Sequence, residues 1–129
     1  MIEYVDSAEG LAPAMLEGVF EGWKRPPSPE SHLAILRNSD HIVLAPDRDT
    51  GKVVGFVTAL TDRVQTAFIP LLEVLPAYRG KGIGPALVSK MLEKLREIPA
   101  SDLTCDSDMQ KFYSEFGMKP SVGMVIRNY

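Results

Sequence analysis

The sequence predicts an α/β (α+β) fold in which a mixed central sheet carries helices on both faces. Short runs rich in Val, Ile and Phe alternate with amphipathic stretches, and turn-forming clusters separate neighbouring runs. One glycine-rich stretch joins the end of a predicted strand to the start of a predicted helix. A chain of 129 residues has the size of one domain. We therefore expect one domain over residues 1–129, with elements in the order β-α-α-β-β-β-α-β-α-β.

The first quarter of the chain contains one predicted strand and two predicted helices. Residues 2–5 are expected to form the strand, and apolar residues at helical spacing predict a helix over residues 13–23. Ser28 followed by Pro29 is typical of an N-cap and a first helical residue. This pair predicts a second helix that runs towards Arg37.

Three strands are predicted in the middle of the chain. Residues 41–45 and 52–60 flank a turn cluster at residues 46–51, which favours a hairpin. A third run covers residues 64–75 and contains Pro70. Because proline lacks the N–H that a ladder requires, we expect a bulge or a splayed edge near it.

The last third of the chain again alternates helix and strand. An apolar stripe over residues 87–95 predicts an amphipathic helix, and residues 103–106 predict a short buried strand. Residues 107–110 have the form of a capping box, which begins a helix that Gly117 ends. Residues 122–128 predict a closing strand.

Composition and charge exclude several classes of protein. Hydrophobic residues make up 45% and charged residues 24%, as in soluble globular domains, and the net charge of -3 gives no basic surface for nucleic acid. Residues 1–6 lack the pattern of a signal peptide, and no apolar run approaches the roughly 20 residues of a membrane span. Cys105 is the single cysteine and has no zinc-ligand spacing, so we expect no metal site. It lies in a predicted buried strand with no paired base, which favours a small core residue over a nucleophile. These features indicate a cytoplasmic protein.

The glycine-rich stretch at residues 78–85 is the candidate binding loop of this sequence. Gly80, Gly82 and Gly84 stand at every second position and leave the backbone N–H groups unshielded. The helix that follows adds unpaired N–H groups and the positive end of its dipole. Arg79 and Lys81 add two cations. Such a loop suits an anion, and a pyrophosphate is the natural candidate.

Two common phosphate-binding loops do not fit these residues. No Ser or Thr follows Gly82 as a Walker loop requires, and a dinucleotide-binding loop that begins at Gly80 would need glycine where Pro85 stands. A flexible turn is the structural alternative. A turn, however, needs only one or two glycines and gains nothing from neighbouring cations.

Two segments of the sequence resemble a known family. The pattern Arg79-x-x-Gly82-x-Gly84 after the apolar run at residues 71–76 resembles the acetyl-CoA loop of the GNAT superfamily of N-acyltransferases. Residues 103–118 resemble the second signature of that family, a strand followed by a helix that ends in Phe-Tyr and then glycine. The resemblance implies a single N-acetyltransferase-like domain with acetyl-CoA as co-substrate.

The resemblance also implies where acetyl-CoA binds. In this family the strand before the loop and the strand after the helix splay apart, and the pantetheine arm pairs with exposed backbone between them. The loop holds the pyrophosphate, and a backbone N–H near Val74 polarises the thioester carbonyl. Asp108 stands where relatives often carry Asn near CoA, although helix capping explains it equally well. The implied binding residues are Leu72, Val74, Leu75, Arg79, Gly80, Lys81, Gly82, Ile83, Gly84 and Asp108.

Two residues are candidates for proton transfer. Related enzymes place a tyrosine at the position of Tyr113, whose phenol can protonate the departing thiolate, whereas a core aromatic is the alternative role. Glu73 is the one carboxylate on the strand before the loop and is the candidate base, with ordered water as the competitor. Many relatives carry acidic residues where this sequence has Pro70 and Leu71.

These features predict an enzyme that transfers an acetyl group from acetyl-CoA to a primary amine by direct attack in a ternary complex. The alternatives are a catalytically silent CoA-binding sensor of the same fold, and a loop that binds another phosphate ligand such as a nucleotide. The acceptor is a small-molecule or peptide amine, contacted mainly by the N-terminal helices and their Pro-rich connection at residues 25–29. A homodimer is possible, with residues 122–128 pairing across its interface.

Overall fold

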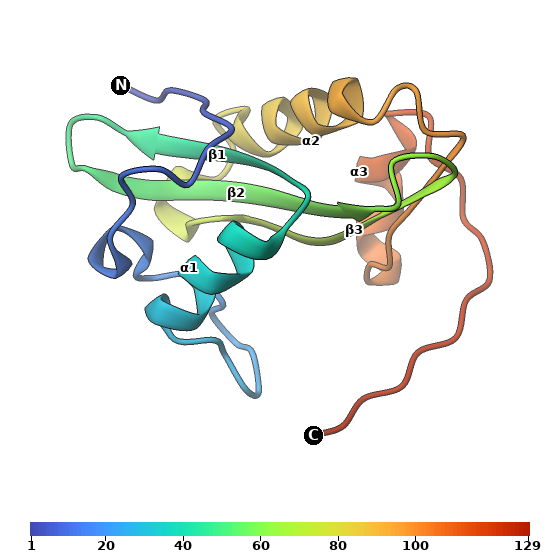
Figure 1. Ribbon diagram of the computed structural model, residues 1–129, viewed down its shortest axis with the longest axis horizontal. Coiled ribbons are helices and arrows are strands. Elements are labelled where there is room, and N and C mark those ends of the chain that lie inside the picture. Colours follow the sequence, from blue (N-terminus) through green and yellow to red (C-terminus); the bar gives the residue numbers. More distant parts are fainter.

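The computed structural model describes residues 1–129 and contains a four-stranded mixed sheet (Figure 1). The strands lie side by side in chain order. The first three are antiparallel to one another, and the fourth runs parallel to the third. The strands are β1 (His41–Asp47), β2 (Lys52–Thr61), β3 (Thr66–Val74) and β4 (Ala100–Asp102).

Helices cover both faces of this sheet, which confirms the predicted fold class (Figure 1). Helix α2 packs on one face through Leu87 and Met91, and helix α1 packs on the other through Leu33 and Leu36. The helices are α1 (Pro29–Asn38), α2 (Ile83–Lys94) and α3 (Gln110–Ser114). Short 3₁₀ turns are η1 (Pro13–Leu16), η2 (Pro76–Tyr78) and η3 (Ser107–Met109).

The N-terminal segment differs from its prediction. Residues 2–5 form only two isolated bridges to β1 in place of a strand. The helix predicted over residues 13–23 is wrong beyond the four residues of η1. Gly18 and Phe20 have φ of 96° and 64°, left-handed values that an α-helix cannot include. The apolar residues that suggested a helix still reach the core, because Leu16 and Phe20 are buried.

Helix α1 begins as its sequence predicts. The Ser28 hydroxyl accepts the Ser31 N–H at 3.1 Å, and Pro29 occupies the first helical position. The β1–β2 hairpin is also confirmed. These elements are determined locally, by a cap and by a turn.

Strand β3 contains the irregularity that Pro70 predicts. Thr58 pairs with Leu71, but Leu60 pairs with Phe68, so β3 has one residue more than β2 between these pairs. Beyond this bulge β3 has no partner on its other side, because β4 pairs only with residues 66–68. The two parallel neighbours therefore splay apart towards the carboxyl end of β3, as the family resemblance implies.

The segment after α2 differs from its prediction in three respects. The strand predicted at residues 103–106 is found at Ala100–Asp102, and the residues after it are unpaired. Cys105 is exposed and is not a core residue. The capping box at residues 107–110 does not form, since neither η3 nor α3 has a side-chain cap. Helix α3 therefore has only five residues, and Gly117 follows it with φ of 85°.

The strand predicted at residues 122–128 is wrong for the single chain. This segment projects away from the sheet (Figure 1), and no backbone hydrogen bond ties residues 119–129 to the rest of the protein. A strand needs a partner edge, and none lies along the path of this segment. None of the helices is long and apolar enough to span a membrane.

Candidate active site

A crevice lies along the carboxyl half of β3. The Leu75 N–H donates to the Val54 carbonyl at 2.8 Å, so residue 75 faces β2. Because antiparallel pairing alternates along a strand, the polar groups of Leu72 and Val74 face the opposite side, from which β4 has diverged. The backbone of Leu72 and the Val74 N–H are therefore open to a ligand, whereas the Leu75 N–H and the Val74 carbonyl are already bonded.

The glycine-rich loop follows this strand through η2. The N–H groups of Gly80, Lys81 and Gly82 have no backbone acceptor, and Ile83 and Gly84 lie in the unpaired first turn of α2. Gly80 and Gly82 have φ of 76° and 85°, and a Cβ added to either would meet no atom within 4 Å. Open space therefore lies beside these glycines, at a helix N-terminus whose amides have no backbone acceptor. This arrangement fits a pyrophosphate.

The side chains of Tyr78 and Arg79 hold the start of the loop in place. The Tyr78 hydroxyl donates to Asp47 Oδ2 at 2.7 Å, a bond that lowers the pKa of Asp47 and raises the pKa of Tyr78. The Arg79 Nε donates to the Val74 carbonyl at 3.0 Å, which places that guanidinium beside the crevice. The Lys81 Nζ lies 5.5 Å from the centre of the Tyr78 ring. Sequence reasoning missed the Tyr78–Asp47 bond, since no motif spacing connects a hairpin turn with this loop.

Close packing at Gly55 fixes the position of α2 on the sheet. A Cβ at residue 55 would lie 3.1 Å from both the Ile83 Cγ2 and the Leu87 Cδ1. Glycine therefore lets the first turn of α2 lie against β2. The sequence did not predict this role of Gly55, because a single glycine inside a strand does not show which element packs against it.

Helix α3 contacts the region where the glycine-rich loop meets the end of β3. A Cβ added to Gly84 would lie 3.9 Å from the Val74 Cγ2 and 3.9 Å from the Phe112 Cζ. The loop, the end of β3 and α3 thus meet at Gly84. Tyr113 follows in the chain, and its ring centre lies 5.0 Å from that of Phe112.

Tyr113 is half-buried at the edge of this meeting point. Burial raises the pKa of its phenol, and negative charge on the neighbouring Cys105 sulfur raises it further. The hydroxyl is therefore protonated at neutral pH, as a proton donor must be. Asp108 lies on η3, with its side chain exposed.

Glu73 lies on the opposite face of the sheet from α2. Its register partner is Phe56, and its Oε2 accepts the Phe20 N–H at 2.7 Å. Burial raises the pKa of this carboxyl, while the Phe20 N–H and the charge of Arg79 lower it in part. One carboxylate oxygen thus positions the segment after η1, at a residue whose backbone is in the left-handed region. Sequence reasoning missed this contact between residues far apart in the chain.

An aromatic cluster lies beneath that segment. His32 is 1% exposed, and its ring centre lies 4.3 Å from that of Phe56 and 4.9 Å from that of Phe20. Neither ring nitrogen has a hydrogen-bond partner, and burial lowers the pKa of His32 to about 4. The ring is therefore neutral at pH 7, and Trp23 extends the cluster towards solvent.

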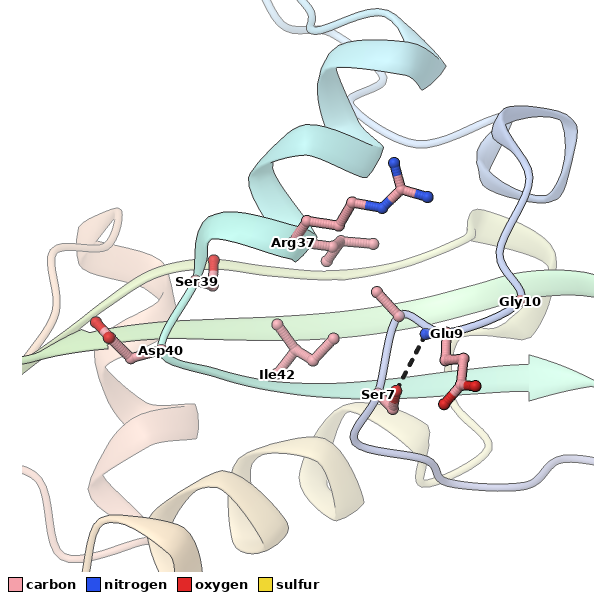
Figure 2. Close-up of a pocket in the computed structure, with 9 residues that line it drawn as sticks. Ser7, Glu9, Gly10, Arg37, Ser39, Asp40 and Ile42 are labelled. Carbon is pink, nitrogen blue, oxygen red and sulfur yellow. Dashed lines mark hydrogen bonds between the residues drawn. The ribbon is translucent and has the colours of Figure 1, made fainter.

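A separate hollow of about 450 Å³ lies between the N-terminal loop and the end of α1 (Figure 2). Its wall includes Arg37 and Asp40, and within it the Ser7 hydroxyl accepts the Glu9 N–H at 3.0 Å. The Asp40 carboxylate is already engaged, by the Thr61 N–H and by Arg63. None of the sequence-predicted site residues lines this hollow.

Comparison with known proteins gives the family. The profile described as the acetyltransferase (GNAT) family matches residues 8–118. The chain therefore belongs to the GNAT acetyltransferase family. A crystal structure from Deinococcus radiodurans R1, assigned as an acetyltransferase, superposes with a TM-score of 0.94 and 42% identity. That match covers 98% of this chain and 88% of the other.

Two more distant relatives are also acetyltransferases. A GNAT family acetyltransferase from Streptococcus pneumoniae TIGR4 has a TM-score of 0.79 and 26% identity, over 99% of this chain and 98% of that one. The uncharacterized N-acetyltransferase ycf52 of Pyropia yezoensis is 28% identical over 99 residues, which are 74% of this chain and 57% of that protein. The chain thus matches little more than half the length of this curated relative.

Proposed function

We propose that this protein transfers an acetyl group from acetyl-CoA to a primary amine by direct attack in a ternary complex. The observation that carries the proposal is the run of unpaired amides at residues 80–84, which adjoins the free edge of β3. The amides would hold the pyrophosphate, and the backbone of Leu72 would pair with the pantetheine arm.

The chemistry requires two proton transfers. The amine nitrogen forms a bond to the thioester carbonyl carbon, the C–S bond breaks, and the sulfur takes a proton from the Tyr113 hydroxyl. The Val74 N–H faces the crevice and would stabilise the negative charge on the carbonyl oxygen. The proton lost by the amine goes to the free oxygen of Glu73, directly or through a water molecule. The raised pKa of Glu73 suits a base better than an ordinary surface carboxylate would.

The acceptor would approach from the face of the sheet opposite α2. Glu73 lies there, Glu21 is close enough to raise the pKa of Glu73, and Trp23 is 45% exposed nearby. Two carboxylates beside an aromatic ring favour a cation. We therefore propose a small-molecule or peptide amine as acceptor. The proposed site of action is the cytoplasm.

Release of free CoA thiol during incubation with acetyl-CoA and a panel of primary amines tests this function. We expect release that depends on both substrates, with mass spectrometry locating the acetyl group on nitrogen. The silent-sensor alternative has one supporting observation, because Glu73 already holds the Phe20 N–H. Acetyl-CoA binding without thiol release for any amine in the panel would favour that alternative. Binding of ATP without binding of acetyl-CoA would overturn both.

A further inference from the structure

The glycine-rich loop has few backbone bonds of its own. The Arg79 N–H donates to the Pro76 carbonyl at 3.3 Å, and the next amide with a backbone acceptor outside the helix ladder is that of Ala86, which donates to the Gly82 carbonyl. Residues 79–82 are all exposed. Glycines in such a stretch add conformational freedom to the chain. The shape of the loop therefore depends on contacts made by side chains at its ends.

Tyr78 makes such contacts at the start of the loop. It is the one residue of the stretch 76–82 that is not exposed, and it packs against the buried cluster that contains Ile83 and Leu87. Its hydroxyl donates to Asp47 Oδ2 at 2.7 Å. Tyr78 thus connects the loop both to the core and to the end of β1.

The Asp47 carboxylate is held ready for this hydroxyl. Asp47 is 7% exposed, and its Oδ1 accepts the Asp49 N–H at 3.0 Å and the Met1 ammonium at 3.1 Å. Its backbone carbonyl accepts the Gly51 N–H at 2.8 Å, within the β1–β2 turn. These bonds fix the carboxylate and direct Oδ2 to Tyr78. Because an unpaired buried carboxylate oxygen is costly, the bond between the two side chains is strongly favoured.

The ring of Tyr78 also contacts the middle of the loop. The Lys81 Nζ lies 5.5 Å from the centre of that ring, which is within the range of a cation–π interaction. Lys81 stands between Gly80 and Gly82, the two left-handed residues of the loop. The hydroxyl therefore fixes the ring, and the ring fixes a cation beside the unpaired amides.

We propose that Asp47 and Tyr78 are positioning residues for acetyl-CoA, and that the bond between them holds the glycine-rich loop in the shape that receives the pyrophosphate. This inference rests on the proposed function, because acetyl-CoA is the ligand it concerns. Both residues act through the loop and leave the chemical step unchanged. A loop that is already ordered loses less entropy when the ligand binds, so the bond strengthens binding.

Binding of acetyl-CoA by substituted proteins tests the bond. Tyr78→Phe keeps the ring and removes the hydroxyl, so we expect a Kd roughly five-fold higher by isothermal titration calorimetry. The KM for acetyl-CoA should rise by the same factor. The kcat for an amine of the panel should stay unchanged at saturating acetyl-CoA. A loss of packing alone would lower stability without this division between KM and kcat in the folded protein.

Tyr4→Phe is the matched control. Tyr4 packs against the same buried cluster, and the Lys90 Nζ lies 5.1 Å from the centre of its ring. Lys90 belongs to the middle of α2 and not to the loop. We therefore expect Tyr4→Phe to bind acetyl-CoA as the unsubstituted chain does. Circular dichroism and urea denaturation check that each variant is folded under the conditions of the assay.

Two substitutions of Asp47 separate position from charge. Asp47→Asn keeps an acceptor oxygen for the Tyr78 hydroxyl, so its Kd should stay within about two-fold of the unsubstituted value. Asp47→Ala removes the acceptor and should weaken binding roughly five-fold, as Tyr78→Phe does. If Asp47 acted only through its negative charge, which repels a pyrophosphate, both substitutions would strengthen binding.

The possible failures point to different conclusions. Equal Kd values for Tyr78→Phe and the unsubstituted chain would overturn the positioning role and leave the proposed function intact. Tighter binding by Asp47→Ala would do the same. Absence of acetyl-CoA binding by the unsubstituted chain would overturn the proposed function and this inference together.

Discussion

The first 95 residues and the last 34 residues of this protein are stabilised differently. Every buried residue lies between Leu16 and Leu95, and none lies after. The first region contains β1–β3, α1, α2 and the glycine-rich loop, whereas the second contains β4, α3 and the projecting segment at residues 119–129. The proposed cofactor loop is exposed but leads into a packed core at Ile83, whereas the proposed proton donor belongs to a thinly packed wall. Binding and proton transfer can therefore be changed separately.

The largest expected effect is on stability in the first region. Leu87 is fully buried between α2 and the sheet, so Leu87→Ala should lower the free energy of unfolding by about 3 kcal/mol. Phe116 is only partly buried at the end of α3, and Phe116→Ala should lower it by less than about 1.5 kcal/mol. Urea denaturation followed by circular dichroism measures both. Equal losses would remove the contrast between the two regions.

The second effect is a loss of stability in acid, which also originates in the first region. The pKa of His32 is about 4 in the folded protein, against 6.5 for an unperturbed histidine. Between these two pH values the unfolded chain therefore binds a proton at His32 that the folded chain does not bind. Stability should fall as the pH drops from about 6.5 to 4, by up to roughly 3 kcal/mol. His32→Leu should flatten this slope in denaturation curves measured at several pH values. His41→Leu is the comparison. The pKa of His41 is also lowered, by partial burial and then by the charges of Arg63 and Lys94, so this variant should flatten the slope less than His32→Leu does. A slope unchanged by His32→Leu would contradict the assignment.

The third effect is on binding. Gly82→Glu places a side chain and a negative charge in front of the unpaired amides, and should weaken acetyl-CoA roughly 30-fold, or about 2 kcal/mol. Gly51→Glu is the control, because Gly51 has a similar φ of 76° in the β1–β2 turn. Isothermal titration calorimetry measures both variants. If the two bind acetyl-CoA equally well, the pyrophosphate does not lie at the loop.

The smallest effect separates catalysis from packing in the second region. Tyr113→Phe should lower kcat roughly ten-fold, because the phenol no longer protonates the thiolate. Acetyl-CoA affinity and the free energy of unfolding should change little, since no hydrogen bond of the phenol supports the fold. Tyr4→Phe, on the N-terminal segment, should leave kcat unchanged. Stopped assays of thiol release give kcat, and unaltered turnover in Tyr113→Phe would leave the residue a packing role only.

The elements that the sequence determined by itself are those with local causes. The Ser28–Pro29 cap begins α1, the turn at residues 46–51 forms the hairpin, and Pro70 produces a bulge. The loop at residues 80–84 was also recognisable, because its glycines and the helix behind them are contiguous in the chain. In each case the signal and the structure lie within a few residues of each other.

Only the tertiary structure decided which distant segments meet. It brought Phe20 to Glu73, Tyr78 to Asp47, and Gly84 to Phe112, contacts between residues that no sequence spacing connects. It also left residues 122–128 without a partner, although their apolar pattern is that of a strand. A periodic pattern specifies which side chains can share a face. Pairing depends on an available edge, and the position of that edge is a property of the folded molecule.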